Sequence, residues 1–196
     1  MADPILINKN GDITTITLNR PEAGNRQTDA TWAQVTQMFD DAAKTSRLIL
    51  FKGAGEDFCL GREAMGQPTP VLEAYAVRDR SETIFNLYGA FRNARVPIIG
   101  VVQGRARKAA TFMIYSAQEI DAHKALTFGL VSDVVPHSEL DASVSRLVEH
   151  FTKMPMAAVL AVKEYARTAF GISTQAATDF ARNLHATVNS FSGMRG

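Results

Sequence analysis

The sequence is poor in the features that mark several large protein classes. One cysteine, Cys59, in 196 residues excludes an intrachain disulfide and a cysteine-rich zinc site. Every apolar run stays well short of the roughly 20 residues that a membrane-spanning helix requires. The 21 lysines and arginines balance 20 aspartates and glutamates, which gives no reason to expect nucleic acid or an anionic membrane as a partner. The first residues resemble neither a signal peptide nor a transit peptide, so we expect a cytoplasmic protein.

Short motifs of several enzyme classes are also missing. The chain has no P-loop, no dinucleotide-binding glycine fingerprint, no metalloprotease helix motif and no hydrolase nucleophile elbow. The histidines have no metal-ligand spacing, and we interpret each as a solvated or packed side chain: His123, His137, His150 and His185. Cys59 has apolar neighbours and no histidine close in the sequence, so it is interpreted as a buried structural residue.

The apolar segments that are present predict an α/β core. Two β-branched runs, Ile5–Asn8 and Ile13–Leu18, are joined through Asn10-Gly11, which suits a type I′ turn and predicts a hairpin. Short apolar runs within residues 47–55, 96–104 and 130–136 predict three further strands. Helical stretches separate these strands, so we expect parallel pairing with right-handed crossovers.

Helices are expected between and after the strands. Thr28 is placed to cap a helix whose buried face is Trp32, Val35, Phe39 and Ala42. Further helices are predicted over residues 71–93, 107–116 and 117–128, the last ended by Gly129.

The last third of the chain is predicted to be helical. Ser138 with Asp141 forms a capping pattern ahead of one amphipathic stripe: Leu140, Val144, Leu147, Val148 and Phe151. Two helices follow over residues 156–170 and 174–190, the second with a common face of Ala177, Phe180, Ala181, Leu184 and Val188.

The segment "GAGEDFCLGRE", Gly53 to Glu63, directly follows a predicted buried strand. Glycine-punctuated turns at the carboxyl ends of parallel strands are where α/β proteins place ligands. The backbone N–H groups of such a turn are suited to stabilise a negative oxygen. A plain strand-to-helix connection explains the segment equally well when it is taken alone.

Four segments together show a family resemblance. In order, "ITTITLNRPEAGN", "RLILFKGAGEDFCLGRE", "VPIIGVVQGRA" and "ALTFGLVSDVVP" resemble the crotonase family, also called the enoyl-CoA hydratase/isomerase family, and the likeness extends over essentially the whole chain. It implies an α/β fold, a crotonase-like spiral of β-β-α units with a helical C-terminal region. It also implies an acyl-CoA thioester as ligand, whose enolate oxygen two backbone N–H groups stabilise. Residues 1–136 would form the core, and residues 137–196 would help to build a homotrimer or a hexamer.

The resemblance assigns roles to two loops. "NRPEAGN" is similar to the family's first loop, which places Asn25, Arg26 and Gln27 near the adenosine end of CoA. Arg26 would contact a phosphate or stack on the adenine. "FCLG" is similar to the first oxyanion loop, so the backbone N–H of Leu60 would be one of the two donors, and Gly61 would let the chain approach the thioester closely.

Arg62, Glu63 and the segment after them match the family less closely. Arg62 and Glu63 stand where the family often has a small residue and then an aspartate. Their side chains would shape the acyl pocket, although a surface ion pair is an equal alternative. The run to Pro70 resembles a mobile loop that covers the acyl group.

The junction between Ala106 and Arg107 sets this chain apart from the family. In crotonase-like sequences a glycine-rich turn with the second oxyanion donor follows here, and later loops carry the catalytic glutamates. In this chain Arg107 begins what resembles a much later helix, so no general acid or base can be assigned. Either the segment is truly deleted, or the protein contains residues that this sequence omits. The strands that a deletion would uncover favour omission, and the unbroken sequence from Met1 to Gly196 favours deletion.

We therefore expect an enoyl-CoA hydratase/isomerase-like protein that acts on acyl-CoA thioesters through an oxyanion hole. Hydration, double-bond isomerisation, decarboxylation and thioester hydrolysis all remain open. No metal or redox cofactor is expected, because the thioester itself acidifies its α-proton and coenzyme A is part of the substrate. The alternative is a non-catalytic acyl-CoA-binding or assembly subunit.

Overall fold

The structure, a computed structural model, describes residues 3–63, 74–106, 120–169 and 171–190. Within these residues four strands form one sheet, in the order in which they occur along the chain. The strands are β1 (Ile5–Asn10), β2 (Ile13–Leu18), β3 (Leu48–Gly53) and β4 (Ile98–Val101). β1 and β2 pair antiparallel, whereas β2, β3 and β4 are parallel, as predicted.

The predicted hairpin is confirmed, but its turn lies one residue later than expected. Asn10 still pairs with Ile13, so Gly11 and Asp12 form the loop. Gly11 has a φ of 57°, and the only described non-glycine residue with positive φ is Asn25, so Asp12 has a negative φ. A glycine with positive φ at the first central position is typical of a type II′ turn, and the type I′ prediction is therefore wrong.

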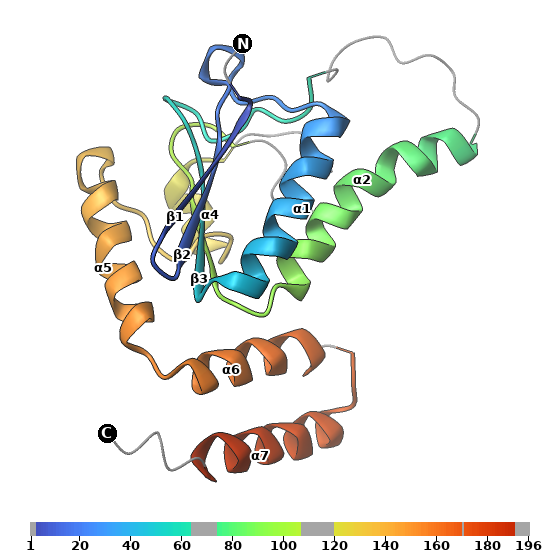
Figure 1. The fold of residues 1–196 in the computed structure, drawn as a ribbon, viewed down its shortest axis with the longest axis vertical. Helices are drawn as coiled ribbons and strands as arrows, with labels where there is room; N and C mark the ends of the chain where they lie inside the picture. The colour runs from blue at the N-terminus through green and yellow to red at the C-terminus, as the bar shows by residue number, and fades with distance from the viewer. Residues whose placement is uncertain (1–2, 64–73, 107–119, 170, 191–196) are drawn as a thin grey trace.

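Helix α1 (Asp29–Thr45) and its cap agree with the sequence prediction. The hydroxyl of Thr28 accepts a hydrogen bond from the backbone N–H of Thr31 at 3.1 Å. The predicted face is the buried one: Trp32, Val35, Phe39 and Ala42. α2 (Ala74–Asn93) lies beside α1, and the two helices cover one face of the sheet (Figure 1).

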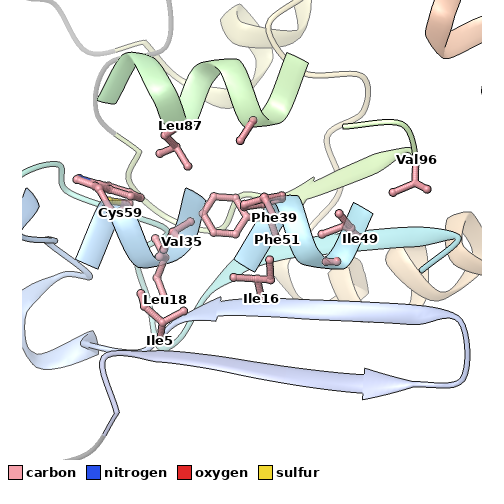
Figure 2. Close-up of a cluster of buried hydrophobic side chains, with 13 residues drawn as sticks. Ile5, Ile16, Leu18, Val35, Phe39, Ile49, Phe51, Cys59, Leu87 and Val96 are labelled. Carbon is pink, nitrogen blue, oxygen red and sulfur yellow. The ribbon is translucent and has the colours of Figure 1, made fainter. Parts of the chain in front are cut away.

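The core lies between this helical layer and the sheet (Figure 2). Phe39 is fully buried, and its ring centroid lies 5.2 Å from that of Phe51 and 4.6 Å from that of Phe91, both in edge-to-face geometry. Ile16 and Ile49 supply fully buried aliphatic side chains from neighbouring strands. Such aromatic pairs add to the free energy of burial because the rings' positive edges face negative π-surfaces.

β4 has a partner on one side only within the described part of the chain, namely β3. Ile98 and Ile99 are half-buried, and Val102, just past the strand, is 44% exposed. The sheet therefore presents an incompletely covered apolar border at the strand that leads to the Ala106–Arg107 junction.

The predicted strand over residues 130–136 is wrong. These residues form bends and irregular chain between α4 (Ala122–Thr127) and a 3₁₀ turn, His137–Glu139. Gly129 ends α4 with a φ of 68°, as predicted. The helix begins later than expected, because the Asp121 carboxylate accepts from the N–H of Lys124 and caps it there.

The C-terminal helices are α5 (Leu140–Lys153), α6 (Met156–Ala169) and α7 (Thr174–Ser190). α5 lies on the sheet face opposite α1 and α2, while α6 and α7 stack against each other beyond the end of the sheet (Figure 1). The predicted capping by Ser138 is wrong, because Ser138 belongs to the 3₁₀ turn and no side chain caps α5.

Some predictions concern parts of the chain outside the described residues, or remain untested. The helix over residues 107–116 and the loop from residue 64 to Pro70 lie outside the described residues. The division of the chain at residue 136 stays a prediction. No helix in the described ranges combines the length and apolar character needed to cross a membrane.

Candidate active site

Two loops meet at the carboxyl ends of β2 and β3. Residues 20–27 follow β2, and residues 54–63 follow β3. Gln27 and Arg62 form a parallel bridge, in which the Gln27 N–H donates to the Gly61 carbonyl at 3.1 Å and the Glu63 N–H donates to the Gln27 carbonyl at 3.0 Å. The edge of a sheet where parallel strands end is a preferred place for ligands. The structure therefore brings together the two segments that the sequence singled out.

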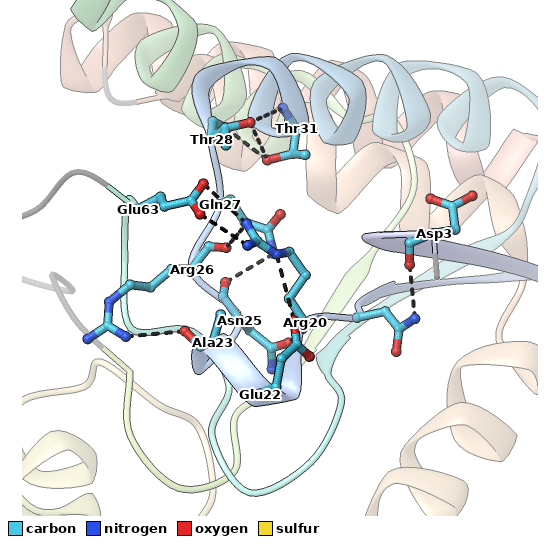
Figure 3. Close-up of polar contacts among 11 residues, drawn as sticks. Asp3, Arg20, Glu22, Ala23, Asn25, Arg26, Gln27, Thr28, Thr31 and Glu63 are labelled. Carbon is cyan, nitrogen blue, oxygen red and sulfur yellow. Dashed lines mark hydrogen bonds and ion pairs between the residues drawn. The ribbon is translucent and has the colours of Figure 1, made fainter. Parts of the chain in front are cut away.

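Asn25 is fully buried and joins these loops (Figure 3). Its Nδ2 donates to the carbonyls of Ala54 and Asp57, both at 2.8 Å. Its Oδ1 accepts from the backbone N–H of Arg20 at 2.8 Å. The side chain thus bonds to the protein's own backbone on both sides of the amide.

The neighbouring Gln27 is also fully buried. Its Nε2 donates to the Asn25 carbonyl at 3.0 Å, and its Oε1 has no partner in the described part of the chain. Arg26, between them, is partly exposed, and its Nη1 donates to the Ala23 carbonyl at 3.2 Å. Of the three residues predicted near CoA, only Arg26 has a side chain that solvent reaches, and the ligand contacts of all three stay predictions.

The proposed oxyanion donor already has a partner. The Leu60 N–H donates to the Gly24 carbonyl at 2.9 Å. For this N–H to act as a donor to a thioester oxygen, the bond to Gly24 would have to be shared or broken. Gly61 has a φ of 102°, a backbone conformation that residues other than glycine strongly disfavour.

Cys59 is buried between the two loops, as predicted for a structural cysteine. Its Sγ donates to the Asn25 carbonyl at 3.3 Å and accepts from the Gly61 N–H at 3.4 Å. Desolvation raises the pKa of the thiol, which keeps it protonated and a poor nucleophile at neutral pH.

Arg62 and Glu63 form ion pairs with residues of the first loop and of α1. Arg20 donates to both oxygens of Glu63, at 3.3 and 3.1 Å, and its hydrogen bond lowers the pKa of that carboxyl. Arg62 pairs with Asp29 through Nε, at 2.8 Å, and through Nη2. The surface ion-pair alternative is thus present, while a role in the acyl pocket stays a prediction.

A third segment, residues 103–106, also reaches this site and was not singled out as functional from the sequence. The Gln103 Nε2 donates to the Gly53 carbonyl at 2.6 Å, and Ala106 forms a bridge with Cys59. Arg105 donates to Asp57 through its backbone N–H, at 3.0 Å, and through its guanidinium, at 2.7 Å. The clue in the sequence was that "QGRA" begins two residues after the last residue of β4, at the same edge of the sheet.

Two carboxyl groups beside these loops, those of Asp57 and Glu63, have no proton to donate at neutral pH. Arg105, through its side-chain hydrogen bond, lowers the pKa of Asp57, and Arg20 does the same for Glu63. Both are therefore ionised at neutral pH. Among the described residues, no three histidine, cysteine or acidic side chains gather as a metal site.

The location of the junction follows from these contacts. Because Ala106 lies against Cys59, the described segment 74–106 ends beside the predicted oxyanion loop.

Structural comparison gives many matches to one fold. An enoyl-CoA hydratase from Mycobacterium smegmatis superposes with a TM-score of 0.87 and 19% identity, over 97% of this chain and 93% of that one. An enoyl-CoA hydratase from Bacillus anthracis gives 0.83 and 18%, over 97% and 92%. A candidate enoyl-CoA hydratase from Thermobifida fusca YX in complex with CoA gives 0.81 and 21%, over 94% and 92%.

Sequence comparison gives a narrower result. No family model matches the chain. The mouse enoyl-CoA hydratase domain-containing protein 3, mitochondrial, is 33% identical in an alignment of 89 residues that covers 40% of this chain and only 30% of that protein. An uncharacterized protein of Caenorhabditis elegans is 21% identical in an alignment of 215 positions that includes only 84% of this 196-residue chain, so that alignment contains gaps in this chain. The chain therefore has the crotonase fold, the fold of the enoyl-CoA hydratases that it resembles.

Proposed function

We propose that this protein binds an acyl-CoA thioester at the meeting of residues 20–27 and 54–63, and that it acts as an enoyl-CoA hydratase/isomerase-like enzyme. The observation that carries the proposal is the Gln27–Arg62 bridge, which joins the two resembling loops at the ligand-binding edge of a crotonase fold. Two superposing Thermobifida fusca structures are complexes, one with CoA and one with acetoacetyl-CoA, which supports the same ligand class here.

In the proposed complex Arg26 contacts a phosphate of CoA. Its guanidinium is partly exposed and forms no carboxylate ion pair within the described residues, so it is suited to a phosphate oxygen. The thioester oxygen lies against the Leu60–Gly61 backbone. An enolate-like oxygen gains from a preorganised donor, whose loss raises the barrier by about 3–4 kcal/mol. Leu60 supplies that donor once its bond to the Gly24 carbonyl is shared or exchanged.

The non-catalytic alternative has one observation in its favour. Asp57 and Glu63, whose carboxyl groups lie next to the loops, are both held ionised by arginine and cannot serve as general acids at neutral pH. A general acid would therefore have to come from elsewhere in the chain, because these carboxylates can only accept a proton. Without one, the protein would bind acyl-CoA or support an assembly without turnover.

We also propose that the C-terminal helices contribute to a homotrimer or hexamer. A hollow of about 280 Å³, the α6 hollow, lies between Pro97, the end of α5 and α6, and Val162 on its wall is 69% exposed. Lys163 also lines it, and burial lowers the pKa of this lysine. An apolar hollow of this kind is suited to contact with another chain.

The first experiment is the intact mass of the purified protein. A mass near 21.4 kDa means that Ala106 joins Arg107 directly. A mass larger by several kilodaltons means that the protein contains further residues, and sequencing then shows whether they lie between Ala106 and Arg107.

The second experiment is calorimetric titration with CoA and with a short enoyl-CoA, followed by a hydration assay. We expect binding that Arg26→Gln weakens about tenfold, equivalent to about 1.4 kcal/mol, while Arg92→Gln, an exposed arginine on α2, leaves it unchanged. Binding with turnover supports the enzyme, and binding without turnover supports the alternative. No binding by the wild-type protein contradicts both.

A further inference from the structure

The two loops at the site are held together by one buried side chain. Asn25 bonds to three backbone groups: the Arg20 N–H in its own loop, and the carbonyls of Ala54 and Asp57 in the loop after β3. Its backbone carbonyl accepts from Gln27 Nε2 at 3.0 Å. The buried Asn25 amide therefore donates to the loop after β3 and accepts from its own loop.

The backbone conformation of Asn25 also depends on the contacts between the two loops. It is the one described non-glycine residue with positive φ, at 53°, and none of its surface is exposed. Asparagine tolerates this left-handed conformation better than most residues, yet it is an uncommon state that surrounding contacts must hold. The Cys59 thiol, which donates to the Asn25 carbonyl at 3.3 Å, adds a contact from the second loop.

We infer that Asn25 is a positioning residue that sets the separation between Arg26 and the Leu60–Gly61 backbone. Arg26 directly follows Asn25, and Leu60 donates to the carbonyl of Gly24, directly before it, at 2.9 Å. A shift of Asn25 therefore moves the predicted phosphate contact and the predicted thioester contact relative to each other. This inference rests on the proposed function, because it concerns the same acyl-CoA site.

The role differs from a direct ligand contact. Both polar atoms of the Asn25 amide are already bonded to backbone, so the side chain has no surface to offer to CoA. Its effect on binding comes through its neighbours. Loss of the amide would leave the part-buried carbonyls of Ala54 and Asp57 without their donor and let the loops separate.

The chain's single cysteine reports loop separation without any ligand. Cys59 is buried between the loops, so iodoacetamide reaches it only when they open. We expect Asn25→Gly, which keeps the positive φ but removes the amide, to speed alkylation of Cys59 at least tenfold in native buffer. We also expect it to weaken CoA binding at least tenfold.

A matched control separates loop opening from loss of stability. Ile16→Val trims a fully buried β2 side chain outside both loops. Urea denaturation of both variants gives the part of the alkylation rate that global unfolding explains. We expect Ile16→Val to keep the CoA affinity within twofold. Its Cys59 alkylation rate should rise only by the amount that global unfolding explains.

The outcomes are distinct. Equal alkylation rates in Asn25→Gly and wild type, after correction for global stability, would overturn the positioning role. If wild-type protein binds no CoA, the proposed function fails, and the alkylation result still decides whether Asn25 holds the loops together. If CoA affinity is unchanged in Asn25→Gly while alkylation accelerates, the coupling to binding is overturned.

One measurement needs no variant and covers the case in which Asn25→Gly does not fold. In native-state hydrogen exchange, the amide of Arg20, held by the Asn25 side chain, and the amide of Leu60 should exchange with the same protection within about threefold. If the Leu60 amide were protected while the Arg20 amide exchanged freely, the two loops would not open and close together, and the inference would be contradicted.

Discussion

The sheet half of the chain and its C-terminal helices bury their apolar residues very differently. Among the described residues, every buried hydrophobic side chain lies between Ile5 and Val101. In the C-terminal helices α5 to α7, the one buried residue among those described is Ser143. The predicted stripe residues Leu140, Phe151 and Phe180 are only half-buried. Leu147 and Val162 are 40% and 69% exposed.

The helices of the two regions are therefore stabilised in different ways. α1 is held by a core that the chain itself completes, because its apolar face packs on Phe51 and Phe91 from other elements. α6 and α7 pack mainly on each other, with Tyr165 and Phe180 stacked at a centroid distance of 6.5 Å. An isolated helix pair gains little free energy in water, so the C-terminal helices are suited to further cover by another chain.

The largest expected effect lies in the sheet half. Phe39→Ala should lower the free energy of unfolding by about 3–5 kcal/mol, because it empties a fully buried ring site between two other phenylalanines. Phe151→Ala, at a half-buried ring on α5, should cost only about 1 kcal/mol. Urea denaturation measures both. Equal losses would show that α5 is buried as deeply as α1 in solution.

Association should depend on the C-terminal helices. Val162→Glu places a charge on the wall of the α6 hollow and should convert an assembly of the wild-type protein to monomers, with little change in monomer stability. Gln34→Glu, which adds the same charge to an exposed position on α1, is the control. Sedimentation over a range of concentrations measures the change. A wild-type protein that stays monomeric at all concentrations would contradict the proposed assembly.

A smaller effect compares the two helix starts. Thr28→Ala should cost about 1 kcal/mol, because the hydroxyl satisfies a backbone N–H at the first turn of α1. Ser138→Ala should leave the free energy of unfolding unchanged, since Ser138 does not cap α5. Thermal denaturation of both variants tests this. A loss on Ser138→Ala similar to that of Thr28→Ala would mean that the hydroxyl caps the helix after all.

The smallest effect concerns pH. Arg105 lowers the pKa of Asp57 in the folded chain, so their interaction stabilises the protein above the unfolded carboxyl pKa of about 3.9 and is lost as pH falls through the lower folded value. Arg105→Gln should therefore be less stable than wild type near neutral pH, and the difference should disappear in acid. Arg167→Gln, which removes an exposed pair within α6, should change little at any pH. A difference for Arg105→Gln that persists below pH 2 would contradict the ionic origin.

Local patterns were sufficient for much of the fold. The α1 face, its Thr28 cap and the parallel strands β3 and β4 follow from periodicity and capping chemistry within short windows. The segment over residues 130–136 was mistaken for a strand because its apolar run is strand-like, yet the described structure gives it no neighbouring strand to pair with. Ser138 failed as a cap because a 3₁₀ turn takes up that residue before α5 begins.

The site likewise combines features that the sequence indicates with contacts that depend on distant residues. The resemblance of "NRPEAGN" and "FCLG" to crotonase loops pointed to two segments, and the structure joins them at the Gln27–Arg62 bridge. The contacts of individual side chains depended on residues distant in sequence. Asn25 and Gln27 are turned inward, and Leu60 donates to Gly24, because the second loop returns across the first.

The sequence by itself determined the elements whose causes are local: the hairpin, the capped amphipathic α1 and the strands β3 and β4. Backbone sterics and hydrophobic periodicity act over a few residues, so they can be recognised without the fold. Only the tertiary structure decided which groups face one another. The bonds of Asn25 to Ala54 and Asp57, and the contact of Ala106 with Cys59, join segments about 30 to 50 residues apart. Such pairings follow from how the loops pack at one edge of the sheet, which no short stretch of sequence specifies.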